Sequence, residues 1–136
     1  MVYDPKTKKL SSLVATYRNQ LFKGPNDLDF DAEGNLYFTD PWGTGAGPDA
    51  ADRTGAVYQY SRQGVLRRVI STGEFPNGIA VSPDDGTLAV ADYAANRMLS
   101  CPFSIGLHEN SRPDFLFPVD LADAGMRGGG RALSDG

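Results

Sequence analysis

The stretch PNDLDFDAEGNLYFTD, residues 25–40, returns in altered form as PNGIAVSPDDGTLAVAD, residues 76–92. From Asn26 to Asn77 is 51 positions, and from Asp40 to Asp92 is 52. A self-similar period of about 50 residues is typical of repeat architectures, in which one supersecondary unit recurs along the chain. The repeat therefore decides the fold class.

Each copy predicts two short strands joined by a tight turn. The turns read Asp-Ala-Glu-Gly and Pro-Asp-Asp-Gly, in which Gly is expected to take the positive φ that hairpins need. A third and a fourth apolar run follow each hairpin. The expected strands are 28–30, 36–39, 56–60 and 65–70 in the first copy, and 79–81, 88–91, 97–101 and 114–117 in the second. Four antiparallel strands per repeat is the plan of a β-propeller blade.

The chain holds too few blades to close a propeller, which needs about 4 to 8. Residues 2–4 and 10–15 resemble the third and fourth strands of an earlier blade, and Ser134-Asp135-Gly136 resembles the Pro-Asn-Gly that opens one. We therefore expect an all-β, partial β-propeller of about two and a half four-stranded blades, in an incomplete chain. In this reading 1–20 ends one blade, 21–73 and 74–120 form the next two, and 121–136 is a loop into another. Open blade edges would also offer a surface for self-association.

The composition limits the kinds of partner that we expect the protein to bind. With 13 basic against 17 acidic residues, a formal charge of −4 and a pI near 4.8, the sequence argues against binding to nucleic acid or to an anionic membrane surface. No apolar stretch approaches the roughly 20 residues of a membrane-spanning helix, and the start has no signal-peptide core. We expect a cytoplasmic protein. The single cysteine, Cys101, is expected to be a buried strand thiol.

The loops that open successive blades converge on the axis of a propeller, which brings Asn26, Asn77 and Asp135 to one small space. Two amide oxygens and a carboxylate form a hard oxygen set that suits Ca²⁺ or a similar divalent ion. An equally weighted alternative is that each Asn only builds an Asx-type turn. Trp42 could wall a pocket for a sugar ring or could simply pack within a blade.

Two segments carry a family resemblance. Gly24-Pro25-Asn26-Asp27 leads to Tyr37-Phe38-Thr39-Asp40-Pro41-Trp42-Gly43, and Pro76-Asn77-Gly78-Ile79-Ala80 leads to Ala91-Asp92-Tyr93. Both hairpins in this order resemble the SMP-30/gluconolactonase/luciferin-regenerating-enzyme-like family of six-bladed propellers over nearly the whole chain. Some members carry an Arg two residues before the first-hairpin Asn, where this chain has Gly24, so the resemblance leaves the substrate open.

The resemblance implies roles for individual residues. Asn77 corresponds to a ligand of the central divalent metal, and Asp135 to a further ligand and catalytic acid/base. Asn26 corresponds to a residue beside the metal that contacts substrate or a metal-bound water. The family's Glu ligand lies upstream of anything in this sequence. The implied cofactor is one divalent ion, Ca²⁺ first, with Zn²⁺, Mn²⁺ and Mg²⁺ as alternatives.

The activity that follows from the resemblance is metal-dependent hydrolysis of a sugar lactone such as gluconolactone, in the complete protein. The sequence has no Gly-x-Ser-x-Gly motif, and its one histidine, His108, lies in a polar loop, which argues against a Ser-His-Asp hydrolase. Two alternatives stay open: a non-catalytic propeller scaffold, and an inactive truncated product.

Overall fold

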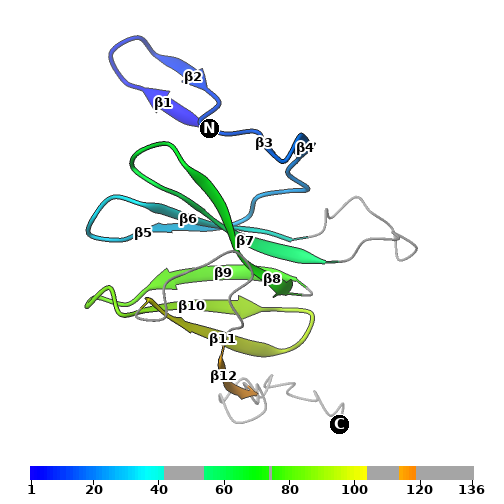
Figure 1. Cartoon of the computed structure of the whole chain (residues 1–136). Helices are drawn as coiled ribbons and strands as arrows, with labels where there is room; N and C mark the ends of the chain where they lie inside the picture. The colour runs from blue at the N-terminus through cyan, green and yellow to red at the C-terminus, as the bar shows by residue number, and fades with distance from the viewer. Residues whose placement is uncertain (42–53, 74, 104–113, 119–136) are drawn as a thin grey trace, which may run out of the picture.

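The computed structural model describes residues 1–41, 54–73, 75–103 and 114–118, and every regular element in these ranges is a β-strand (Figure 1). Two four-stranded antiparallel sheets hold most of the described chain, with strand orders β5-β6-β7-β8 and β9-β10-β11-β12. The bounds are β5 Leu28–Phe30, β6 Leu36–Asp40, β7 Gly55–Tyr60, β8 Leu66–Gly73, β9 Pro76–Val81, β10 Thr87–Asp92, β11 Arg97–Pro102 and β12 Asp114–Pro118. Within the described ranges no helix has the length and apolar character needed to cross a membrane.

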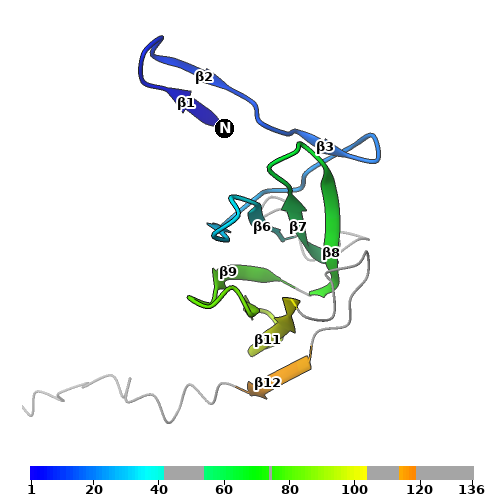
Figure 2. The same cartoon turned by 60° about the vertical axis from the view of Figure 1, so that its left-hand side comes forward.

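The two sheets stack face to face as successive layers, and the described sheets form an open stack rather than a closed ring (Figure 2). The fold is a partial β-propeller, as predicted. The sheet β5 to β8 lies within the predicted segment 21–73, and the described strands β9 to β12 lie within 74–120. The predicted loop 121–136 lies outside the described residues.

The N-terminal part differs from the prediction. β1 (Val2–Asp4) pairs with β2 (Lys9–Ser11), so the expected strand over 10–15 ends at Ser11. A second hairpin that the sequence did not predict follows, made of β3 (Thr16–Tyr17) and β4 (Gln20–Leu21). Its two central residues, Arg18 and Asn19, both have positive φ, at 50° and 64°. Two consecutive residues with positive φ form the tight turn that suits a two-residue hairpin. The turn contains no glycine, so the sequence pattern did not indicate it.

The turns of the two repeats also differ: glycine takes the positive φ in the first turn, as predicted, but not in the second. In the first hairpin Gly34 takes φ 83° and donates its N–H to the Asp31 carbonyl at 3.0 Å. In the second, Asp85 takes φ 51° and donates to the Ser82 carbonyl at 2.9 Å. Gly86 is therefore an extra residue beyond the turn position, which explains why the repeat lengthens from 51 to 52 positions. Asp tolerates this conformation because its short polar side chain can hydrogen-bond locally.

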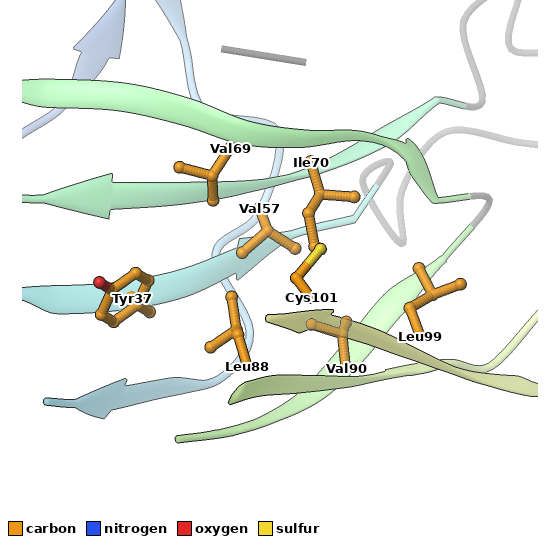
Figure 3. Close-up of a cluster of buried hydrophobic side chains, with 8 residues drawn as sticks. All are labelled: Tyr37, Val57, Val69, Ile70, Leu88, Val90, Leu99 and Cys101. Carbon is orange, nitrogen blue, oxygen red and sulfur yellow. The ribbon is translucent and has the colours of Figure 1, made fainter. Parts of the chain in front are cut away.

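The core lies between the two sheets. Side chains from β6, β7 and β8 meet side chains from β10 and β11 (Figure 3), namely Tyr37, Val57, Val69, Ile70, Leu88, Val90, Leu99 and Cys101. Cys101 is buried in this cluster, as the sequence predicted. Because side chains alternate across a strand, Leu36 and Phe38 point to the opposite face of β6. There Tyr17 and Phe22 cover them, and the ring centroids of Phe22 and Phe38 are 5.2 Å apart.

Candidate functional site

The two asparagines lie at equivalent places at the start of neighbouring inner strands. Asn26 precedes β5 by two residues, Asn77 is the second residue of β9, and β9 packs against both β5 and β6. The sheets thus bring Asn26 and Asn77 to the same end of the stack. Asp135 and Trp42, the other two predicted site residues, lie outside the described residues.

Each asparagine begins a β-bulge, in which two residues oppose one residue of the partner strand. On β9, Pro76 pairs with Asp92 and Ile79 with Val90, so Asn77 and Gly78 together face the single residue Ala91. At the first site the Asn26 N–H donates to the Thr39 carbonyl, and the Thr39 N–H donates to the Asp27 carbonyl, both at 3.0 Å. Bulges bend a strand and re-aim a side chain, and they are common beside active sites.

The geometry decides against the Asx-turn alternative. An Asx turn at Asn26 would need the Leu28 N–H, but this group donates to Asp27 Oδ1 at 2.9 Å. An Asx turn at Asn77 would need the Ile79 N–H, which donates to Asp27 Oδ2 at 3.0 Å. Neither Asn carboxamide hydrogen-bonds to another residue of the described ranges. Neither side chain is therefore used to build its own turn.

Aspartates of β5 and of the turn before it join the two inner strands. Asp27 Oδ2 accepts the Ile79 N–H at 3.0 Å, and Asp29 Oδ2 accepts the Val81 N–H at 2.8 Å. Each carboxylate uses its other oxygen for the amide of the residue that follows it in β5. The free edge of β9 is thus capped by side chains of the preceding repeat, which protects an exposed strand edge. This role was not predicted from the sequence, although the alternation Asp-Leu-Asp-Phe over 27–30 is a visible signal of it.

The aspartates that close each repeat fix the loops leading to the asparagines. Asp40, which is buried, accepts the N–H groups of Lys23 at 3.1 Å and Gly24 at 2.8 Å. Asp92, fully buried, accepts the Phe75 N–H at 2.8 Å and pairs with Arg97, whose Nη2 is 2.9 Å from Asp92 Oδ2. In both repeats the closing carboxylate therefore holds the backbone one or two residues before the Pro-Asn pair.

A mostly apolar cavity of about 250 Å³ opens beside Asn26. Asn26 and Asp27 provide its polar edge, and Phe22, Leu28 and Phe38 are among its apolar walls. Small-molecule sites combine apolar walls with a few convergent polar groups but usually enclose about 300–1,000 Å³, so this cavity is smaller than most. It extends from the bulge at Asn26 toward the N-terminal hairpins.

The donor chemistry around the two bulges fits a hard divalent cation. Carboxamide oxygens are among the ligands that Ca²⁺ takes in proteins. In the ranges that the structure describes, no three His, Cys, Asp or Glu side chains cluster closely enough to hold a metal alone. The described part of the chain therefore offers amide ligands from Asn26 and Asn77, and a complete coordination shell needs carboxylates from elsewhere.

Comparisons with known proteins show which family the chain is similar to. The model of the "SMP-30/Gluconolactonase/LRE-like region" matches residues 1–126. A gluconolactonase of Zymomonas mobilis is 35% identical over 96 residues, which are 68% of this chain and 27% of that protein. Diisopropyl-fluorophosphatase of Loligo vulgaris is 40% identical over 63 residues, 43% of this chain and 20% of the relative.

The fold comparison points the same way. A solved gluconolactonase from Xanthomonas campestris superposes with a TM-score of 0.66 and 25% identity, over 81% of this chain and 40% of that structure. The chain thus spans about a quarter of the length of the curated gluconolactonase it matches.

Proposed function

This chain belongs to the SMP-30/gluconolactonase/LRE-like family, and we propose that the intact protein hydrolyses a sugar lactone with the help of one divalent cation. The relatives named above are hydrolases by name, two of them gluconolactonases. The two asparagines that would face the cation are present here, at the positions that the family resemblance assigns to them.

The observation that carries the proposal is the state of the two carboxamides. Asn26 and Asn77 begin matching bulges on adjacent inner strands, and the backbone amides that would tie them into turns are taken by Asp27. A side chain kept only to shape its own loop would use those amides. Two oxygen donors held at one end of the stack favour a ligand between them.

In the proposed site Asn77 and Asp135 are metal ligands, and Asn26 contacts the substrate or a water beside the metal. A bound divalent ion would act as a Lewis acid toward the lactone carbonyl and would lower the pKa of a bound water. Asp135 would take the proton from that water as general base. The apolar cavity beside Asn26 would hold the less polar side of the substrate, and Trp42 would add a wall.

The test is a lactone assay on the intact protein. We expect Ca²⁺-dependent opening of gluconolactone that a chelator abolishes, and loss of more than about 100-fold in kcat/KM for Asn77→Ala, because a metal ligand is removed. Asp135→Asn should abolish turnover while it leaves the fold intact. Asn96→Gly is the matched control, since Asn96 is exposed in a turn at φ 48°. Unchanged turnover in Asn77→Ala would refute the proposal and support a binding scaffold.

A second activity is favoured by the 40% identity to diisopropyl-fluorophosphatase, a relative named for a phosphofluoridate substrate. The same cation and carboxylate could serve displacement at phosphorus instead of carbon. Fluoride release from diisopropyl fluorophosphate, measured beside the lactone assay on one preparation, separates the two activities. Fluoride release without lactone opening would assign the phosphorus chemistry.

A further inference from the structure

The Thr39 side chain hydrogen-bonds to the backbone beside Asn26 and to the backbone of Asn77 itself. It lies in β6 with none of its surface exposed. Its own backbone faces the first bulge through hydrogen bonds with Asn26 and Asp27. Its hydroxyl donates to the Asn77 carbonyl oxygen at 2.8 Å, across the boundary between the two sheets.

The hydroxyl acts where the strand ladder is interrupted. Asn77 has no Cα partner on β10, because it forms the bulge with Gly78. A bulged residue is free of the regular pairing that fixes its neighbours, so its orientation depends on other contacts. Thr39 supplies such a contact at the peptide unit that carries the Asn77 side chain. The same hydroxyl oxygen accepts the Asp27 N–H at 3.1 Å, which links the two bulges through one atom.

The second repeat shows that this contact is not part of blade packing in general. Asp92 corresponds to Asp40, so Ala91 corresponds to Thr39. Alanine has no hydroxyl and cannot make the contact, yet the second repeat forms its bulge opposite Ala91 all the same. Formation of a bulge within a sheet therefore does not require a hydroxyl at this position.

We propose that Thr39 is a positioning residue that sets the orientation of Asn77 relative to Asn26. This inference rests on the proposed function, in which Asn77 binds the cation. The Thr39 hydroxyl, which belongs to the first sheet, hydrogen-bonds to the Asn77 peptide of the second sheet. The distance between the Asn26 and Asn77 carboxamides is therefore tied to the distance between the two sheets. Hydrogen-bond partners behind a metal ligand orient it, and their removal typically lowers metal affinity or activity by about 10- to 100-fold.

The experiment compares four variants of the intact protein. Thr39→Val keeps the shape and removes the hydroxyl, Thr39→Ala copies the residue of the second repeat, and Thr39→Ser restores the hydroxyl. Thr87→Val is the matched control, because it removes a threonine hydroxyl from the other sheet, at the far end of β10 from Asn77. The readouts are Ca²⁺ affinity by calorimetry, kcat and KM for gluconolactone, the thermal midpoint, and the NMR signals of the Asn77 carboxamide without metal.

We expect the Ca²⁺ Kd to rise about 10- to 100-fold in Thr39→Val and Thr39→Ala, and to return toward the parent value in Thr39→Ser. The Asn77 carboxamide signals should shift in the first two variants and stay in place in Thr87→Val. An unchanged Ca²⁺ Kd in both hydroxyl-free variants would overturn the proposal, even if the thermal midpoint falls.

The NMR readout separates this inference from the proposed function. A parent protein that neither binds Ca²⁺ nor opens a lactone would refute the metal-dependent lactonase. In that case shifted Asn77 signals in Thr39→Val would still support the positioning of Asn77, and unshifted signals would overturn it as well.

Discussion

Removal of the buried carboxylate of Asp92 should destabilise the protein strongly. Asp92 is fully buried, and among the described residues it accepts hydrogen bonds from Phe75 N at 2.8 Å, Arg97 Nε at 3.1 Å and Arg97 Nη2 at 2.9 Å. In Asp92→Ala the guanidinium loses its carboxylate partner and the Phe75 amide loses its acceptor. Breaking a buried ion pair by removing one partner costs about 3–5 kcal/mol.

The lower part of that range applies here. The Arg97 side chain keeps 27% of its surface exposed, so water can solvate part of the charge that Asp92 leaves behind. The lost acceptor for the partly buried Phe75 N–H adds up to about 1 kcal/mol, because a hydrogen bond of this kind contributes about that much to stability. We therefore expect the free energy of unfolding to fall by about 3–4 kcal/mol in Asp92→Ala.

Urea denaturation of the intact protein at neutral pH measures this change, and a double-mutant cycle identifies its source. Arg97→Met removes the other partner, and the double variant removes both charges. If the ion pair is the cause, the double variant costs less than the sum of the single variants by about 1–3 kcal/mol. A loss below about 1 kcal/mol in Asp92→Ala, or additive single variants, would refute the reasoning.

Two further predictions concern other buried groups. Burial raises the pKa of Tyr37 to about 12, above the value of about 10 for an unfolded chain. The contribution of its neutral phenol to stability is therefore complete below about pH 10 and lost as the pH rises toward 12. In Tyr37→Phe the free energy of unfolding should fall less steeply over this pH range. An equally steep fall in the variant and the parent would contradict the prediction. Gly55→Ala should destabilise by about 1–3 kcal/mol, because an added Cβ would overlap the ring of Pro76, with Cγ only 2.8 Å away. An unchanged urea midpoint in Gly55→Ala would show that β7 and β9 can separate at this point.

The destabilisation expected in Asp92→Ala and in Gly55→Ala could not be predicted from the local sequence. The strand at 87–92 alternates in a way that predicts a half-buried strand, but alternation alone does not tell a carboxylate that binds Arg97 from one that faces solvent. Gly55 reads as an ordinary strand residue until the packing of β7 against Pro76 is known. Such effects depend on which residues of another repeat come close.

The sequence by itself determined the repeat, the hairpins 28–30 with 36–39 and 79–81 with 88–91, and the partial propeller. These follow from short-range chemistry, because turn residues and period-two alternation act within a few residues of one another. The same repeat placed Asn26 and Asn77 at matching positions, and the roles of Asp135 and Trp42 stay predictions. Where two turn residues compete, as Asp85 and Gly86 do, the local pattern chose the wrong one.

Only the tertiary structure decided what surrounds the asparagines. The bulge at Asn77, the caps from Asp27 and Asp29 to β9, and the contact from the Thr39 hydroxyl all join residues 38 to 52 positions apart or depend on the register between strands. No local pattern encodes these contacts, because they arise when one sheet packs on the next and an unpaired strand edge must find donors and acceptors. The sequence supplied the candidate ligands, and the stacking of the two sheets placed them together.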